Sequence, residues 1–548
     1  MSRRAWCCLA LVFTLIGCEQ GIQPAEPTPR PSPSPTQEQP EGATLRWAVQ
    51  EPTGIVPSVV VDDTALLIVD TLFDSLTQVT ADGTVLPSAA VAWDVFEQGR
   101  RWRFTLRDGA RYHDGTPVRA RDFVNAWSMT VDQGRTGAHL QDVVGYRSLR
   151  AGQANTLAGV RAIDELTLEV ELRAPNMELP AIVAHPSLGP VPPRAVERAA
   201  RFTERPVGNG PYAMAEPWAH GQFIRVVRAE GWRNGQRRRA RDRVREIVFR
   251  IIDVDAAYVG FQQGRIDVAS VPPGALAQAR RVYGIGHDGA GPGVVEAPEL
   301  SLYFLGMRVD MPPWDDREVR RALSRAIDRH AISEANSDRQ IDAADGLVPP
   351  SLPGAGAVFC DTCLHLPSLA EAEFRRAGVT EFTLAYDEGG GHEEIARQIR
   401  QDLARIGVTV ELQGMAFDEY LGALERGELG LYRFGWQAQY ASAGAMLEPL
   451  LRSGAPIEAG DGANYGGYAS AEVDRLIEQA RATASPHERQ ELWARAERVA
   501  LRDQALIPLF TFRQRTVISR RVENLTLMPW GTVTPEQAYV VAEPEVVQ

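Results

Sequence analysis

The chain has 548 residues and a formal net charge of −13 at pH 7, and 44% of its residues are hydrophobic. This length and balance predict two or three globular domains, and the acidic excess argues against nucleic acid as a partner. All 58 basic residues are arginines, which excludes phosphate-binding loops and covalent mechanisms that need a lysine. If ATP drives any step, another chain must bind it.

The N-terminus has the pattern of an export signal. Two arginines precede an almost entirely apolar run from Trp6 to Ile16, which is much shorter than the roughly 20 residues that span a membrane. The run ends in Leu15-Ile16-Gly17-Cys18, which resembles the lipobox of bacterial lipoproteins, in which the cysteine is lipidated. We therefore predict a signal peptide over 1–17 and lipidation of Cys18. The alternative is an ordinary secretory signal that happens to contain a cysteine.

A proline-rich stretch follows the cysteine. Seven prolines lie between Gln23 and Glu41, mixed with Ser, Thr, Gln and Glu. Such a stretch cannot bury a core and tends toward polyproline II, a semi-rigid spacer. We predict a tether over 18–42; a ligand for a proline-binding domain is the alternative. After Pro40 no apolar run is long enough to span a membrane.

Apolar periodicity predicts an alternation of strands and helices along the first part of the chain. Val49, Leu106 and Leu172 each end a run with the pattern of a strand. The predicted strands are 44–49, 102–106, 166–172 (strictly alternating), 243–252 and 266–271. The predicted helices are 64–76 and 119–130, with a turn at Asp82-Gly83.

The second part of the chain contains a strand–helix–strand unit, predicted over 382–386, 393–406 and 408–412. Such a unit implies a parallel sheet. The pattern also predicts helices over 316–332, 471–483 and 486–502, and strands over 507–512 and 516–519.

No catalytic or metal-binding constellation is evident. Cys360 and Cys363 favour a local disulfide in an oxidising compartment, with a redox pair or a zinc site using His365 as alternatives. The G-x-G-x-x-G pattern at 284–289 is not followed by a helix, so that a mobile loop is a better interpretation than a nucleotide site. His392-Glu393 lacks a second metal ligand four residues later. We predict no catalytic residue, no metal site and no cofactor.

An ordered set of segments between about residues 45 and 527 resembles one family, the extracytoplasmic solute-binding proteins of ABC importers. The likeness is to the peptide and nickel class (family 5), and to its oligopeptide-binding members in particular. The segments are Phe73–Leu76, Leu86-Pro87, Val91–Trp93, Arg101–Gly109, Tyr112–Pro117, His185–Pro192, Val207–Tyr212, Gln263–Val268, Asp316–Arg329 and Tyr432–Trp436.

The resemblance implies an α/β, two-lobe periplasmic-binding-protein-like fold of class II type with an extra inserted domain. The implied limits are 43–80, 203–301 and 507–548 for lobe one, 81–202 for the inserted domain, and 302–506 for lobe two. It also implies a monomeric, lipid-anchored, extracytoplasmic receptor that is not an enzyme. Such a receptor captures a peptide-like solute between its lobes, bound as an added strand, and delivers it to the permease and ATPase subunits. The alternatives are a binder of a non-peptide solute such as a sugar or an opine, a sensor or chaperone, and a hydrolase with an unmarked site.

The ligand-binding candidates implied by the resemblance are Trp436, Gly435, Gln437, Gln439, Arg433 and Tyr303. Trp436 matches an aromatic residue of the cleft, Gly435 sits where the ligand backbone passes, and Arg433 matches an arginine that can bind a carboxylate. Gln439 stands where the family has an aspartate that binds the ligand's α-ammonium, and a neutral amide cannot form that ion pair. Gln437 stands at one position of a disulfide found in close relatives. Tyr303 is expected either to line the cleft or to fill the core of a strand.

Overall fold

The structure is a computed structural model that describes residues 43–133, 137–197, 199–234, 243–286, 291–336, 341–356, 358–454, 462–528 and 535–541. The chain divides into two units, 1–41 and 42–548, and all described residues belong to the second. The predicted signal peptide, the lipidated Cys18 and the proline-rich tether lie outside the described residues. In the part of the chain that is described, no helix combines the length and the apolar content that crossing a membrane requires.

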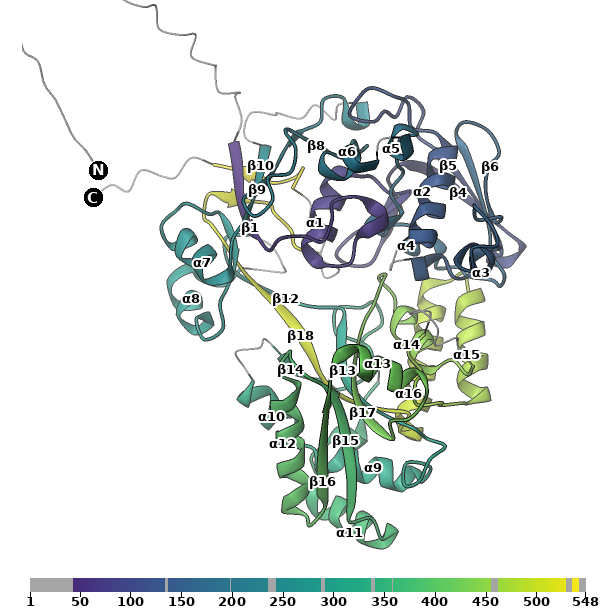
Figure 1. Ribbon diagram of the computed structural model, residues 1–548, viewed down its shortest axis with the longest axis vertical. Helices are drawn as coiled ribbons and strands as arrows, with labels where there is room; N and C mark the ends of the chain where they lie inside the picture. Colours follow the sequence, from purple (N-terminus) through teal and green to yellow (C-terminus); the bar gives the residue numbers. More distant parts are fainter. Residues whose placement is uncertain are drawn as a thin grey trace, which may run out of the picture. The chain divides into compact units, whose positions relative to one another are not determined.

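A twelve-stranded sheet runs through both halves of this unit in the order β16-β15-β17-β13-β18-β11-β1-β10-β9-β8, with β12 and β14 also paired to β18 (Figure 1). The first half contains β1 (Ala43–Val49), β8 (Tyr212–Met214), β9 (Phe223–Arg228), β10 (Val244–Ile251), β11 (Val268–Ser270) and β12 (Gly293–Pro298). The second half contains β13 (Ser301–Met307), β14 (Ile341–Ala343), β15 (Glu381–Asp387), β16 (Thr409–Met415) and β17 (Leu431–Gln437).

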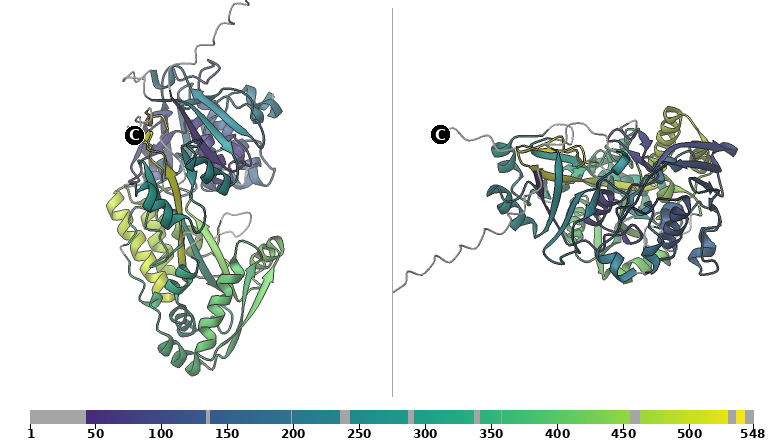
Figure 2. Two further views of the ribbon diagram at one scale, coloured as in Figure 1. Left: turned by 90° about the vertical axis from the view of Figure 1, so that its left-hand side faces the viewer. Right: turned by 90° about the horizontal axis from the view of Figure 1, so that it is seen from above.

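The long strand β18 (Leu506–Ile518) belongs to both halves (Figures 1 and 2). Its first part pairs with β13, where Gly306 faces Leu506, and its last part pairs with β11, where Val268 faces Ile518. The prediction of two separate strands, 507–512 and 516–519, is therefore wrong. Residues 513–515 continue the strand because they pair with Glu296–Pro298 at the end of β12.

Helix α1 (Asp63–Leu72) begins where Asp62 accepts a hydrogen bond from the backbone N–H of Ala65, as an N-cap does. It ends four residues before the predicted end because the chain after Leu72 packs against a glycine-rich loop. The backbone N–H of Gly210 donates to the Leu72 carbonyl, and a Cβ at Gly208 would overlap that oxygen. The other helices of the first half are α7 (Val254–Gln262) and α8 (Leu276–Tyr283).

The segment between α1 and β8 (residues 77–204, the inserted segment below) has a sheet of its own in the order β4-β5-β7-β6, plus a β2-β3 hairpin. Glu169 in β7 is a buried charged residue, since only 5% of it is exposed. It is buried because Arg103 and Arg161 pair with it from the neighbouring strands. The strands are β2 (Thr77–Val79), β3 (Val85–Pro87), β4 (Ala90–Phe96), β5 (Arg101–Leu106), β6 (Val160–Ala162) and β7 (Thr167–Glu171). The helices are α2 (Ala120–Gln133), α3 (Tyr146–Arg150), α4 (Leu179–Ile182), α5 (Arg194–Glu197) and α6 (Ala199–Glu204).

The second half confirms the predicted parallel unit. β15 and β16 pair in parallel, and α12 (His392–Arg405) connects them. The prediction of one helix over 316–332 is wrong, because the chain forms α9 (Arg317–Ala326) and α10 (Arg329–Ala335) with extended backbone at Ile327. The other helices of this half are α11 (Pro367–Ala377), α13 (Phe417–Glu425), α14 (Gly444–Leu451), α15 (Ala471–Ala482) and α16 (Pro486–Asp503). A small pair, β19 (Val522–Glu523) and β20 (Tyr539–Val540), follows β18.

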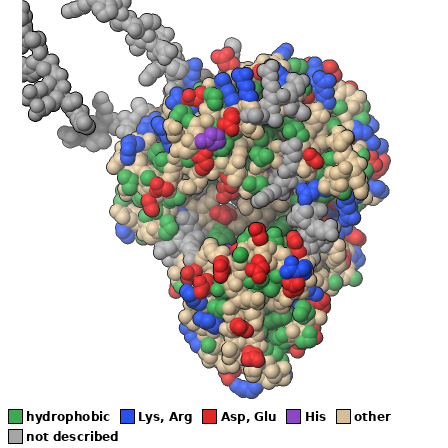
Figure 3. All heavy atoms as spheres, viewed as in Figure 1, with side chains coloured by type: hydrophobic (Ala, Val, Ile, Leu, Met, Phe, Trp, Pro, Cys, Tyr) green, Lys and Arg blue, Asp and Glu red, His purple; other side chains and the backbone are tan. Residues whose placement is uncertain are grey.

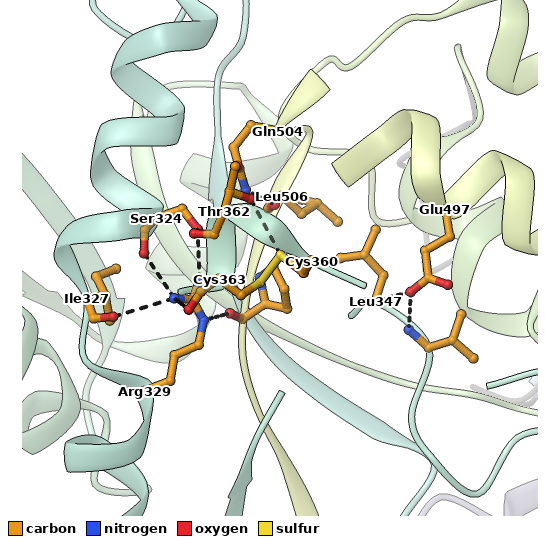
Figure 4. The surroundings of a disulfide bond; sticks show 12 residues. Ser324, Ile327, Arg329, Leu347, Cys360, Thr362, Cys363, Glu497, Gln504 and Leu506 are labelled. Atoms are coloured by element: carbon orange, nitrogen blue, oxygen red, sulfur yellow. Dashed lines mark hydrogen bonds between the residues drawn. A yellow bond between two sulfur atoms is a disulfide. The ribbon is translucent and has the colours of Figure 1, made fainter. Parts of the chain in front are cut away.

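Cys360 and Cys363 form a disulfide beside the junction of α9 and α10 (Figure 4). The buried Arg329 donates hydrogen bonds to the carbonyls of Cys363 and Pro508, and burial lowers its pKa to about 9. Ser324 donates to the Thr362 carbonyl. The disulfide loop is thereby fixed to the α9–α10 junction and to β18. The described residues contain no group of three or more His, Cys, Asp or Glu side chains suited to hold a metal ion.

Candidate ligand-binding site

Two adjacent cavities lie where the chain leaving β17 meets the inserted segment. The first cavity has a volume of about 100 Å³, and the second has a volume of about 40 Å³. Gln439 and Tyr440 line both. The first is also lined by Phe73, Asp74, Ala184, His185, Arg233 and Glu536, and the second by His139, Asp142, Asn176, Trp436, Ala445 and Glu448. Figure 3 shows the surface hollowed near the middle of the molecule.

The alternation of β17 divides the candidate residues between the two faces of the strand. Trp436 is on the face that points toward α14, where its Nε1–H donates to the Ala445 carbonyl at 2.9 Å and its ring lines the second cavity. Gln439 follows the strand and lines both cavities. The structure therefore brings Trp436 and Gln439 together, as the resemblance implied.

The other face of β17 carries Arg433, Gly435 and Gln437, none of which lines these two cavities. Gln437 is exposed, and a Cβ built on Gly435 would meet only the Leu302 carbonyl oxygen, at 3.8 Å. Arg433 forms an ion pair with Asp387 at the end of β15, and burial lowers its pKa. The role of these three residues in ligand binding stays a prediction.

Tyr303 lies in the core rather than in either cavity. It is 2% exposed, and its ring stacks on Phe510 with centroids 4.4 Å apart. Its hydroxyl is 3.3 Å from Nδ1 of His392. Of the two expectations for Tyr303, the structure therefore favours the strand core, and its place in the candidate site stays a prediction.

Two histidines of the inserted segment face the cavities, and sequence reasoning missed both. His139 lies in a short 3₁₀ helix (η3, Gly137–Leu140), and His185 precedes another (η4, Pro186–Leu188). Their rings lie 4.1 Å apart. Burial lowers the pKa of His139 to about 4, and burial together with His139 lowers the pKa of His185 well below its usual value. His185 belonged to a segment that carried the resemblance, whereas no pattern in the sequence marks His139.

Buried ion pairs join the inserted segment to the second half next to the second cavity. Arg481 of α15 pairs with Asp142 at 2.5 Å and with Glu448 of α14, and its side chain is 4% exposed. Burial alone would lower the pKa of Arg481, but the two carboxylates outweigh it and raise this pKa. The backbone N–H of Met177 donates to the Arg481 carbonyl at 2.7 Å.

Glu178 makes a second buried connection. Its carboxylate accepts a hydrogen bond from Ser442 and lies 3.3 Å from Nε of Arg489, both in the second half. Burial raises the pKa of Glu178. In the first cavity, Asp74 accepts hydrogen bonds from Trp232 at 2.9 Å and from Arg233 at 3.3 Å. Each of these acidic groups thus has an arginine beside it.

Two sheet regions that share one long strand, an inserted segment, and polar cavities at their junction define a two-lobe α/β binding protein of the periplasmic-binding-protein type. The family description "Bacterial extracellular solute-binding proteins, family 5 Middle" matches residues 84–456, and the chain belongs to this family. The predicted fold class and family are confirmed.

Similar proteins cover most of the chain. The probable deoxycholate-binding periplasmic protein YgiS of Escherichia coli is 27% identical over 84% of this chain and 86% of its own length. The dipeptide-binding protein DppE of Bacillus subtilis is 25% identical over 96% of each chain. Among solved structures, the unliganded open form of the murein tripeptide-binding protein MppA aligns with a TM-score of 0.77 at 24% identity, covering 92% of this chain and 98% of that one.

Proposed function

We propose that this chain is the solute-binding component of an ABC importer and captures a peptide-like solute in the two cavities between β17 and the inserted segment. The observation that carries the proposal is the convergence of Trp436, Gln439 and Tyr440 with polar groups of the inserted segment around one pair of cavities. A site between domains, with a few converging polar groups, suits a small ligand. The relative named as a dipeptide-binding protein supports the same solute class.

The edge of β17 supports a peptide as the solute. β17 pairs with β13 along its whole length, but with β15 only at Tyr432, which faces Ala385. Among the described strands, none pairs with the other edge of β17 from Phe434 to Gln437. An unpaired strand edge is a template to which an extended peptide adds as a further strand, with main-chain hydrogen bonds that do not depend on the peptide's sequence.

Mass spectrometry of the solute that co-purifies with the full-length chain tests the proposal, followed by calorimetry with tripeptides. We expect peptide masses and saturable binding, and recovery of the peptides intact, because the chain binds its solute without breaking a bond. Trp436→Ala should weaken binding, whereas Leu86→Ala, an exposed position in β3, should not. Absence of any bound or binding peptide contradicts the proposal.

A non-peptide solute is the second candidate function, because the relative YgiS is named as a probable deoxycholate-binding protein. The first cavity also has apolar walls, among them Phe73, Val79 and Met528. Calorimetry with deoxycholate in parallel with the tripeptides separates the two candidates. Binding of deoxycholate with no response to peptides would favour the second.

We also propose that a lipid on Cys18 anchors the chain outside the cytoplasm, where it delivers its solute to a permease driven by a separate ATPase. The pattern Leu15 to Cys18 supports the anchor. Cys18→Ala should move the chain from the membrane fraction to the soluble fraction, because a tether without acyl chains has no affinity for a bilayer. A wild-type chain that is already soluble and carries no lipid mass would contradict this anchor.

The domain limits given by the resemblance are part of the proposal: lobe one over 43–80, 203–301 and 507–548, the inserted domain over 81–202, and lobe two over 302–506. The separate β4-β5-β7-β6 sheet supports the inserted domain. The division of β18 between β11 and β13 supports a lobe boundary within that strand.

A further inference from the structure

We propose that the space between Gln439–Tyr440 and the neighbouring rings of His139 and His185 is a subsite for an uncharged, hydrogen-bonding group of the solute, and that it rejects a free ammonium or carboxylate. This proposal rests on the proposed function, because it concerns the same two cavities. It narrows the solute class to peptides whose amino end is blocked or cyclised, or to other amide-rich neutral solutes.

The histidine pair is held uncharged by its geometry. Nδ1 of His185 lies 3.2 Å from the backbone N of Ser187 and 2.7 Å from the Ser187 Oγ, and both groups can donate a hydrogen bond to an unprotonated Nδ1. The His139 ring is 4.1 Å away, so a charge on one ring opposes a charge on the other. Burial lowers the pKa of both, to about 4 for His139. At neutral pH the wall opposite Gln439 is therefore two neutral imidazoles.

The carboxylates around the second cavity are already balanced by arginines. Asp142 and Glu448 both pair with Arg481, and Glu448 also pairs with Arg452 at 2.7 Å. An ammonium placed beside Gln439 would lose its hydration without gaining a free counter-charge, which is unfavourable. A carboxylate of the solute would also lose its hydration without gaining a free counter-charge, since Arg481 already binds the carboxylates of Asp142 and Glu448.

Two further carboxylates near the cavities also lie beside an arginine. Asp74 pairs with Arg233, and Glu178, in contact with Gly444 behind the second cavity, lies beside Arg489. Glu536 differs, because no arginine lies within ion-pair distance of it among the described residues. Burial raises the pKa of Glu536, which favours its neutral form. Glu536 is thus the alternative place for a solute cation, and the experiment must separate it from Gln439.

Hydrogen-bonding capacity is available at the subsite. Gln439 has an amide that both donates and accepts, and Tyr440 has a hydroxyl. Nδ1 of His139 is buried and has no hydrogen-bond partner among the residues that the structure describes. A buried polar atom of this kind is costly unless a ligand or a water satisfies it. An acylated nitrogen or a hydroxyl can satisfy these groups without bringing a charge.

Calorimetry on the full-length chain in detergent compares trialanine with N-acetyl-trialanine, which differ only in the ammonium. We expect the acetylated peptide to bind at least tenfold more tightly. Gln439→Asp should reverse this preference, because it supplies a free carboxylate. The matched control Gln413→Asp introduces the same charge on an exposed position of β16 and should leave both affinities unchanged.

The outcomes separate this proposal from the proposed function. If trialanine binds as tightly as its acetylated form, or more tightly, the proposed peptide capture stands and only the neutral subsite is overturned. A loss of trialanine binding in Glu536→Gln would then locate the cation at Glu536. If neither peptide binds, the proposed peptide capture is overturned, and the neutral subsite with it.

Discussion

The carboxylate of Asp387 at the end of β15 pairs with the guanidinium of Arg433 in β17, and the two side chains are only 9% and 13% exposed. The guanidinium also lies 5.5 Å from the ring centroid of Tyr303. Nε2 of His392 is 3.8 Å from the other carboxylate oxygen of Asp387. A solute carboxylate that approaches Arg433 must therefore compete with an internal carboxylate.

Asp387→Asn should destabilise the chain by about 3–5 kcal/mol, because it leaves a buried arginine without its counter-charge. Urea unfolding measures this loss. The double variant Asp387→Asn/Arg433→Gln removes both charges and should recover most of the stability. A single variant within about 1 kcal/mol of wild type would show that water reaches Arg433 and balances its charge.

The parallel β15–α12–β16 unit was predictable because its signal is local: strand alternation, a helical period and short connections. The break between α9 and α10 was not, since apolar positions continue the helical pattern through Ile327. The break depends on distant partners. The backbone N–H of Asp328 donates to Asp402 of α12, and Arg329 donates to the Pro508 carbonyl in β18.

The residues of the candidate site were likewise predictable where the signal is local and not predictable where it depends on distant partners. Trp436 and Gln439 were found because they lie in one short segment that carries the resemblance. His139 and Arg481 were missed because their roles come from partners far along the chain, His185 and Asp142. A lone histidine, or an arginine on an amphipathic helix, is usually solvated. Only the packing of the inserted segment against the second half brings His139 to the wall of the second cavity and buries Arg481 beside two residues of that wall, Asp142 and Glu448.

Arg481→Gln should destabilise the chain by about 3–5 kcal/mol, because Asp142 would lose its cation and Glu448 would keep only Arg452. Chemical unfolding monitored by tryptophan fluorescence measures the change. Arg475→Gln, an exposed position of the same helix, is the matched control and should change stability by less than about 0.5 kcal/mol. Equal effects of the two variants would contradict the role of the buried ion pairs.

Glu497 makes stability depend on pH. Its side chain accepts hydrogen bonds from the backbone N–H groups of Leu347 and Val348 (Figure 4), and burial raises its pKa from 4.5 to about 7. Because the folded state holds this proton more tightly than the unfolded state, stability falls as pH rises from 4.5 to 7. The loss is roughly 3 kcal/mol at most.

Glu497→Gln should therefore be more stable than wild type at pH 8, by up to roughly 3 kcal/mol, and should lose this advantage near pH 4.5. The amide oxygen still accepts from Leu347 and Val348, since both bonds go to one oxygen of Glu497. Denaturant unfolding at several pH values measures the difference. Glu491→Gln, exposed on the same helix, serves as the control. A constant difference across this pH range would place the titration elsewhere.

A solute bound in the two cavities should stabilise the folded chain in proportion to its affinity. The solute would contact Gln439 in the second half and His139 and His185 in the inserted segment, and unfolding separates these residues. A ligand that binds only the folded state adds about 2.7 kcal/mol at a free concentration 100 times its dissociation constant. Thermal unfolding of wild type and Trp436→Ala, each with the same solute, measures the effect. Because Trp436→Ala should bind the solute more weakly, the solute should stabilise this variant less than it stabilises wild type. An unchanged stabilisation in that variant would place the solute outside the second cavity.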